Sequence, residues 1–274
     1  MRRFDLVLLQ LVMLLASAGA ARAQQNTASR AVVRRSEVLT LLGFGVAAAA
    51  IAPADERLAG WIRGPGVQGP GLNHVAGVFN FAGDPGTLVA DAALYVFGAA
   101  THRRHAMDAA VHIGESVVAA SVITGVLKMA AGRARPYVSA DSNSRDLRFG
   151  RGRDGGLYQS LPSGHTTAAF AFASAMASEA ATWTPNWRWV APVGYSAATL
   201  VALARMYDDK HWASDVVLAA GIGTATAKAT VRFNHARPRN RIDRLFIPSD
   251  VGAFHLSIFR SVDGRTRVGL ARAW

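Results

Sequence analysis

A histidine and an aspartate, His211 and Asp215, stand four residues apart at the expected start of a helix. Residues at this spacing lie on one face of a helix, so the carboxylate can hold one nitrogen of the imidazole ring. The other nitrogen can then act as a nucleophile or a base, as in a catalytic triad without its serine. Arg205, six residues earlier, adds a cation. The same pair, taken alone, is equally typical of an ordinary helix cap.

A second segment, Pro162-Ser163-Gly164-His165, places a histidine in the first turn of another expected helix. Ser163 is a residue type that caps helices, and Gly164 lets a ligand approach the backbone. Free amides at a helix N-terminus attract anions, and His165 beside such an anion can act as a general acid. The alternative is an ordinary capped helix with a surface histidine.

Two further cations, Lys128 and Arg135, lie near the end of a third expected helix. Pro136 stops that helix and biases Arg135 toward an extended backbone. Two cations fixed in this way can clamp a tetrahedral oxyanion, and arginine can do so through two hydrogen bonds. The alternative is that both side chains only complement the helix dipole.

Together the three segments resemble the signature of the type 2 phosphatidic acid phosphatase superfamily, which also contains bacterial acid phosphatases and vanadium haloperoxidases. That signature is K-x6-R-P, then P-S-G-H, then S-R-x5-H-x3-D. The chain supplies its parts in order, as Lys128 to Pro136, Pro162 to His165, and Arg205, His211 and Asp215. The resemblance covers about residues 120–231 and implies a helical bundle. One position departs, because the family serine before Arg205 is Ala204 here.

The resemblance implies a role for each matching residue. His211 would attack phosphorus and form a phosphohistidine, with Asp215 orienting the ring and stabilising its cationic form. His165 would protonate the leaving oxygen and then deprotonate the attacking water. The groups that would hold the phosphoryl oxygens are Lys128, Arg135, Arg205, the Ser163 hydroxyl and the Gly164 amide. The hydroxyl missing at Ala204 implies weaker phosphate binding.

Phosphoryl transfer needs positioning and charge stabilisation more than covalent chemistry. Three cations and several amides can replace Mg²⁺, so we expect a phosphoric ester hydrolase that uses no metal and no other cofactor. We also expect inhibition by vanadate, which mimics the transition state. The expected substrate is a phosphomonoester or diphosphate, of a lipid or of a small molecule. Two alternatives stay open: a haloperoxidase with vanadate as its cofactor, and a non-catalytic anion-binding envelope protein.

The elements that must position these residues are expected to be helices. Apolar periodic stretches indicate six of them, at about 38–52, 87–100, 106–131, 164–182, 189–205 and 213–231. The Gly- and Pro-rich stretch 60–86 indicates a loop, with a short helix near Phe79. Alternating residues around Asp263-Gly264 indicate a β-hairpin. We therefore predict an all-α domain of about six helices over residues 24–245, followed by a small C-terminal hairpin over 246–274.

The composition excludes several classes of protein. The 274-residue chain is 51% apolar and 18% charged, which excludes a disordered or collagen-like chain. It has no cysteine, which excludes disulfides and thiolate chemistry. The net charge of +12 fits an anionic partner. Residues 1–23 have the plan of a signal peptide, with an uncleaved membrane anchor as the alternative. An exported protein disfavours nucleic acid as that partner.

The sequence leaves open whether the helices cross a membrane. Several are shorter than the roughly 20 residues that a span needs. The basic segments 101–105 and 232–244 would lie in the cytoplasm by the positive-inside rule, which places the three motifs on the outer face. A cleaved signal followed by three spans would instead leave Arg135 inside. We expect an envelope protein that faces the periplasm, either soluble or membrane-associated.

Other histidines carry weaker signals. His102 and His105 can suggest a metal pair with Asp108, but a basic turn between two helices is the favoured interpretation. His112 and Glu115 fall on one helix and are interpreted as a polar stripe. His74, His235 and His255 have no partners in the sequence.

Overall fold

The computed structural model describes residues 33–138, 143–184, 187–238, 240–247, 254–260 and 266–272. The predicted signal peptide, residues 1–23, lies outside this part of the chain. The predicted domain limits at 24–245 and 246–274 stay predictions.

The described chain is helical, which confirms the all-α class. Its α-helices are α2 (Arg35–Ile51), α3 (Asp55–Ile62), α4 (Pro70–Gly83), α5 (Gly86–Ala100), α6 (Arg104–Ala131), α7 (Gly164–Trp183), α8 (Trp187–Tyr207), α9 (Ala213–Ala236) and α10 (Arg241–Phe246). Short 3₁₀ turns lie at Ala52–Ala54, Arg151–Asp154 and Gly156–Tyr158. All six predicted helices are present, although α9 continues to Ala236 instead of ending near residue 231.

The prediction of about six helices was too low, because α3, α4 and α10 were not expected as helices of this length. The clearest case is α4, which occupies much of the stretch interpreted as a loop. Pro70 stands in the first turn of α4, and Gly69 before it is extended. Proline is well suited to that position, since its missing amide has no partner in a helix start anyway. Gly69, Pro70 and Gly71, which favoured a loop, therefore form the start of a helix.

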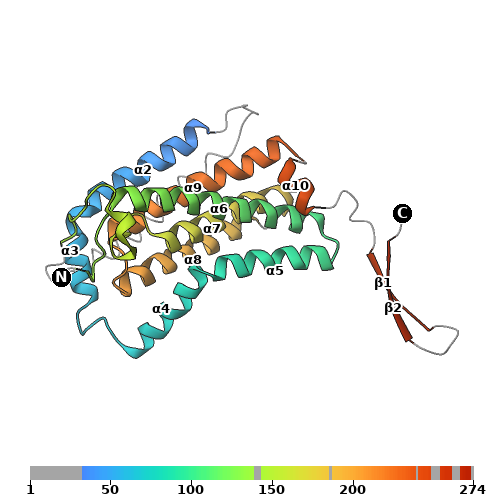
Figure 1. The fold of residues 1–274 in the computed structure, drawn as a ribbon, viewed down its shortest axis with the longest axis horizontal. Helices are drawn as coiled ribbons and strands as arrows, with labels where there is room; N and C mark the ends of the chain where they lie inside the picture. Colours follow the sequence, from blue (N-terminus) through green and yellow to red (C-terminus); the bar gives the residue numbers. More distant parts are fainter. Residues whose placement is uncertain are drawn as a thin grey trace.

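In the tail, strands β1 (Phe254–Arg260) and β2 (Thr266–Arg272) pair antiparallel, from Phe254 opposite Arg272 to Arg260 opposite Thr266 (Figure 1). The predicted turn at Asp263-Gly264 and all side chains of the tail lie outside the described residues. The hairpin as a folded unit of the tail therefore stays a prediction.

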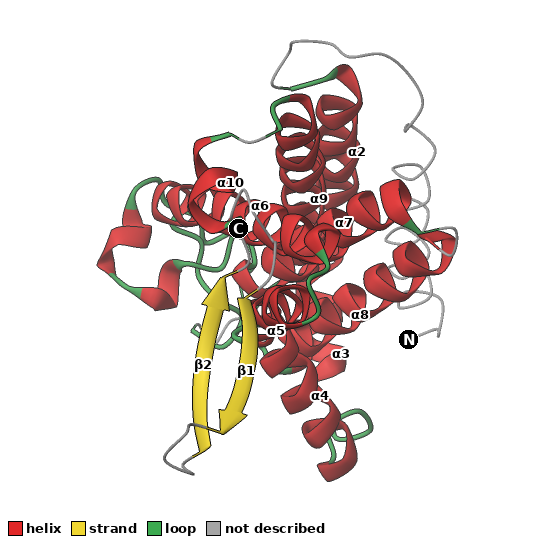
Figure 2. Cartoon of the chain, turned by 90° about the vertical axis from the view of Figure 1, so that its right-hand side faces the viewer, coloured by secondary structure: helices red, strands yellow, loops and turns green. Residues whose placement is uncertain are grey.

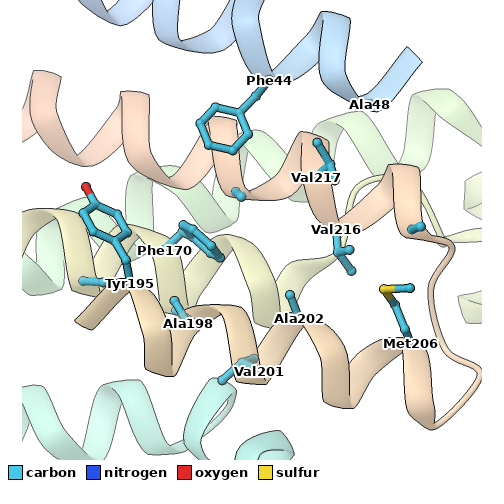
Figure 3. Close-up of a cluster of buried hydrophobic side chains, with 14 of the residues drawn as sticks. Phe44, Ala48, Phe170, Tyr195, Ala198, Val201, Ala202, Met206, Val216 and Val217 are labelled. Carbon is cyan, nitrogen blue, oxygen red and sulfur yellow. The ribbon is translucent and has the colours of Figure 1, made fainter. Parts of the chain in front are cut away.

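Helix α7 is the centre of the bundle and contacts α6, α8 and α9 (Figure 2). Helix α2 covers α9, α5 covers α6, and α4 lies against α8. Large side chains in the main core come from several helices at once, as Phe44, Phe170, Tyr195 and Met206 show (Figure 3). A Cβ at Gly221 would overlap Phe44, so this glycine is what allows α2 to approach α9 closely. The three helices that carry the sequence motifs are thus held against one another.

The bundle has two ends of different character. At one end, named here the motif end, the amide of Ser214 in α9 donates to Asp55 of α3 at 2.9 Å. At the other, named the basic end, Arg232 of α9 pairs with Glu37 of α2 at 2.9 Å. Helix α2 therefore runs antiparallel to α9 and begins at the basic end. Arginines near the basic end are Arg34, Arg35, Arg103, Arg104, Arg237, Arg241 and Arg244.

Two segments of the described chain, Arg35–Ile62 and Arg104–Ala131, are long and apolar enough to cross a membrane. Both expose apolar side chains at helical spacing. On α6 these are Val118, Val122 and Val126, and on α2 they include Leu39, Leu42 and Val46, which is 70% exposed. Contiguous apolar surface of this kind indicates contact with a partner or with lipid.

Candidate active site

A cavity of about 370 Å³ at the motif end brings the three sequence motifs together. Among the predicted site residues, those that line it are Lys128, Arg135, Gly164, His165, Arg205 and His211. They come from α6, the loop after it, the start of α7, the end of α8 and the loop before α9. Residues far apart in the sequence therefore surround one space that combines two imidazoles with three cations.

The ring of His211 is oriented by a backbone carbonyl. Its Nδ1 lies 2.7 Å from the carbonyl oxygen of Ser160. A carbonyl only accepts hydrogen bonds, so Nδ1 must carry the proton and Nε2 keeps its lone pair. Nε2 is the nitrogen that a nucleophilic attack requires.

Asp215 does not make the direct hydrogen bond to His211 that the sequence predicts. Its Oδ2 lies 3.8 Å from Nδ1 of His211, which is too long for a hydrogen bond. The four-residue spacing assumed that both residues are helical, but α9 begins only at Ala213, so His211 precedes the helix. Asp215 instead accepts from the Trp212 amide at 2.9 Å and from the Ser160 hydroxyl at 2.5 Å. It holds the Ser160 segment, whose carbonyl orients the ring.

Burial sets the protonation state of both imidazoles. It lowers the pKa of His211 to about 3, and the charges of Lys128 and Arg135 add to its effect against the opposing charge of Asp215. Burial, followed by the Arg205 guanidinium, lowers the pKa of His165 to about 4. Both rings are therefore neutral at pH 7. A neutral imidazole can act directly as a nucleophile, but it must take up a proton before it can act as an acid.

The three cations are positioned by neutral oxygens. Lys128 Nζ donates to the carbonyl of Gln159 at 2.6 Å, and Arg135 Nε donates to the carbonyl of Gly156 at 2.7 Å. Arg205 Nη1 donates to the Asn80 side-chain oxygen at 2.8 Å. Within the described residues none of the three forms an ion pair with a carboxylate. Their N–H donors are thus held in fixed directions and are not paired with a carboxylate there, which is what an anion site needs.

The start of α7 differs in part from the prediction. Ser163 occupies the N-cap position, but its side chain makes no capping hydrogen bond and its hydroxyl accepts from Thr166 at 3.0 Å. Ser163 is fully buried and does not line the cavity, so a contact between its hydroxyl and phosphate stays a prediction. Gly164 does line the cavity. Ala204 is buried in α8 and is not among the residues that line the cavity, so the predicted effect of the missing hydroxyl stays a prediction.

His165 is the ring left open to a ligand. Within the described part of the chain it makes no hydrogen bond, although it faces the cavity. The end of α4 closes over it, because a Cβ at Gly83 would lie 3.1 Å from Cβ of His165. Its nitrogens are therefore available to a group bound between the three cations.

A buried charge network supports the site from behind, and sequence reasoning missed it. Arg133 donates to Asp215 at 2.5 Å and to Asp55, the first residue of α3, at 2.8 Å. It also donates to the Ser214 hydroxyl at 2.8 Å and to the carbonyl of Ser144. In the sequence, Arg133 is one of several arginines between the expected helices 106–131 and 164–182, and nothing in the pattern connects it with Asp55.

Known proteins share both sequence and fold with this chain. Residues 109–239 match the family model of the PAP2 superfamily. A lipid A 1-phosphatase from Porphyromonas gingivalis is 39% identical over 82 residues, which is 30% of this chain and 18% of that protein. A solved structure, the first transmembrane PAP2 type phosphatidylglycerolphosphate phosphatase from Bacillus subtilis, superimposes with a TM-score of 0.57 at 20% identity. That superposition covers 74% of this chain and 96% of the other.

Residues 109–239, just under half of the chain, are therefore similar to the PAP2 superfamily, as the three motifs indicated. The matched range contains every motif, from Lys128 to Asp215. The structural likeness, at 20% identity, shows the shared fold. The chain spans less than a fifth of the length of the lipid A 1-phosphatase.

Proposed function

We propose that the chain is a phosphatase that hydrolyses a phosphorylated lipid through a phosphohistidine on Nε2 of His211. The observation that carries the proposal is the hydrogen bond from Nδ1 of His211 to the Ser160 carbonyl. It leaves the unprotonated Nε2 in a cavity with three cations that have no carboxylate partner within the described part of the chain. A neutral imidazole beside an anion site is the arrangement that phosphoryl transfer to histidine requires.

The reaction has two steps. In the first, Nε2 of His211 attacks phosphorus, the bond from phosphorus to the leaving oxygen breaks, and His165 gives its proton to that oxygen. In the second, His165 takes a proton from water, the water oxygen attacks phosphorus, and the bond to Nε2 breaks. An anionic phosphate in the cavity opposes the charges that lower the pKa of His165. Substrate binding is therefore the step that protonates it.

The same cations stabilise the transition state. Lys128, Arg135 and Arg205 are already oriented by fixed oxygens, so little reorganisation is needed when charge develops on the phosphoryl group. We infer that catalysis needs no metal ion and that vanadate inhibits by occupying this cradle.

A lipid substrate fits the walls of the cavity. Besides the charged groups, the lining includes Leu88 of α5 and Val117 of α6. Next to them on the outer surface, Val89 and Val118 are more than half exposed. A phosphate head group held by the cations can therefore extend its apolar part between α5 and α6. The named relatives, a lipid A 1-phosphatase and a phosphatidylglycerolphosphate phosphatase, support this class of substrate.

We further propose that the apolar faces of α2 and α6 contact a membrane, with the motif end on the periplasmic side. The arginines of the basic end would then lie in the cytoplasm, as the positive-inside rule favours. This orientation places the start of α2 in the cytoplasm as well. A cleaved signal peptide would instead leave residue 24 outside. The proposed orientation and the predicted cleavage of a signal peptide therefore exclude each other.

The orientation can be tested because the chain has no native cysteine. We would introduce one cysteine at exposed Arg153, at the motif end, and separately at exposed Arg103, at the basic end. A membrane-impermeant maleimide should label intact spheroplasts only through R153C. Labelling only through R103C would reverse the proposed orientation.

The activity is tested by phosphate release in the presence of EDTA, from phosphatidate micelles and from a soluble aryl phosphate. Wild type should release phosphate, faster from the lipid, and His211→Ala should not. Halide-dependent peroxide consumption without phosphate release would instead favour the haloperoxidase alternative. Equal release by His211→Ala would exclude this residue as the nucleophile.

A further inference from the structure

Three side chains that the sequence did not connect meet at the basic end. Glu179 of α7 lies between two histidines, with its Oε1 2.6 Å from Nδ1 of His112 on α6. The same oxygen lies 2.9 Å from Nε2 of His235 on α9. One potential ligand atom from each residue lies within 4.8 Å of the others. His112 is 16 residues before Lys128 on α6, so the cluster is roughly 24 Å along the helix from the lysine that holds the phosphate.

A fourth group, Asp243 of α10, completes the surroundings of His112. Its Oδ1 lies 3.5 Å from Nε2 of His112 and is buried, and it has no hydrogen-bond partner among the residues that the structure describes. Histidines that bind a metal through one nitrogen usually direct the other nitrogen at a carboxylate, which fixes the ring. Asp243 stands where that partner is needed.

The cluster is also accessible. It lies on the wall of a cavity of about 660 Å³ at the basic end, whose rim includes Arg104, His105 and Arg244. The side chain of His235 is 38% exposed, whereas that of Glu179 is only 4% exposed. An ion can therefore enter past His235 and reach a buried carboxylate.

We propose that His112, Glu179 and His235 bind a divalent metal ion of the zinc type, with Asp243 holding the other ring nitrogen of His112. Two imidazoles and one carboxylate form a common zinc ligand set, with solvent in the fourth position. At metal–ligand bonds of about 2.0–2.1 Å, tetrahedral ligand atoms lie about 3.3 Å apart. The ring nitrogens of His112 and His235 would therefore move away from Oε1 by about 0.7 and 0.4 Å. They would also approach each other, from a separation of up to 4.8 Å.

The ion would join three long helices at the end of the bundle far from the phosphate. Since α6, α7 and α9 also carry the catalytic groups at their other ends, the metal acts as a structural cross-link and takes no part in the proposed reaction. This inference does not depend on the phosphatase proposal.

The test uses the full-length chain, purified in detergent with a tag that contains no histidine and freed of metal by a chelator. Zn²⁺ binding is measured by calorimetry, and the visible spectrum of the Co²⁺-loaded protein reports the ligand geometry. Glu179→Gln keeps an oxygen that accepts from both rings but removes the charge, and His235→Ala removes an accessible ligand. His105→Ala, on the same cavity rim, is the matched control.

Wild type and His105→Ala should bind one Zn²⁺ and give the intense visible bands of tetrahedral Co²⁺. Glu179→Gln and His235→Ala should bind at least about 100-fold more weakly, and their unchanged metal-free melting temperatures would show that they are folded. Absence of saturable binding by wild type, or equal binding by His235→Ala, would overturn the proposal and leave a hydrogen-bonded cluster only.

Discussion

Replacing Arg133 by methionine should destabilise the protein more than any comparable change at a surface arginine. Arg133 is 6% exposed and donates to two buried carboxylates, those of Asp215 and Asp55. Methionine keeps much of the volume but leaves both carboxylates without their cation. Breaking a buried ion pair from one side costs about 3–5 kcal/mol. At about 2–4 °C per kcal/mol for a domain of this size, the melting temperature should fall by about 6–20 °C.

Thermal unfolding in detergent measures this loss. The control is Arg153→Met at an exposed position, which should change the free energy of unfolding by less than about 0.5 kcal/mol. Adding Asp55→Asn to Arg133→Met removes one of the two carboxylate charges that have lost their cation. The double variant should therefore lose less than the sum of the single changes, with a coupling of about 1–3 kcal/mol. If Arg133→Met melts like Arg153→Met, the buried network does not hold the site and the reasoning is refuted.

Three further predictions follow from the site. Vanadate should inhibit phosphate release competitively, and full activity at saturating vanadate would contradict the proposed cradle. Asn80→Ala removes the oxygen that orients Arg205, so the inhibition constant of inorganic phosphate should rise by about 2- to 10-fold. An unchanged inhibition constant would show that this contact is dispensable. Because the pKa values of His211 and His165 are lowered to about 3 and about 4, the unfolded chain binds more protons than the folded chain at acid pH. Stability should be full above about pH 6.5 and fall as pH drops toward 3, and His211→Asn should lose less stability than wild type over this range in melting scans.

The helices were predictable where apolar periodicity and clear end signals coincide. Helix α6 ends at Ala131, before Pro136, and α7 begins at Gly164, directly after Ser163. The stretch that forms α4 was misinterpreted because its glycines and proline favour a loop locally. Contacts with α8, such as that between Asn80 and Arg205, supply stabilisation that local propensity does not report.

The residues of the site were predictable from the sequence, but the hydrogen bonds that orient them were not. The motifs named the residues that line the cavity. They could not show that His211 precedes its helix, so the expected hydrogen bond to Asp215 is replaced by one to the Ser160 carbonyl. Backbone carbonyls such as those of Ser160, Gln159 and Gly156 carry no residue signature, and so no sequence pattern could assign them. The same limit explains why Asp55 and Glu179, whose partners are more than 50 residues away, were missed.

The central claim is that Nε2 of His211 carries the phosphoryl group between the two steps, and trapping that intermediate tests it most directly. Wild type, His165→Ala and His211→Asn would be mixed with a radiolabelled aryl phosphate, whose leaving group needs little protonation, and quenched in alkali. His165→Ala should accumulate label on the protein, stable in alkali and lost in acid, because its second step lacks the base. His211→Asn should carry none. Label on His211→Asn, or phosphate release by His211→Asn at the wild-type rate, would contradict the account.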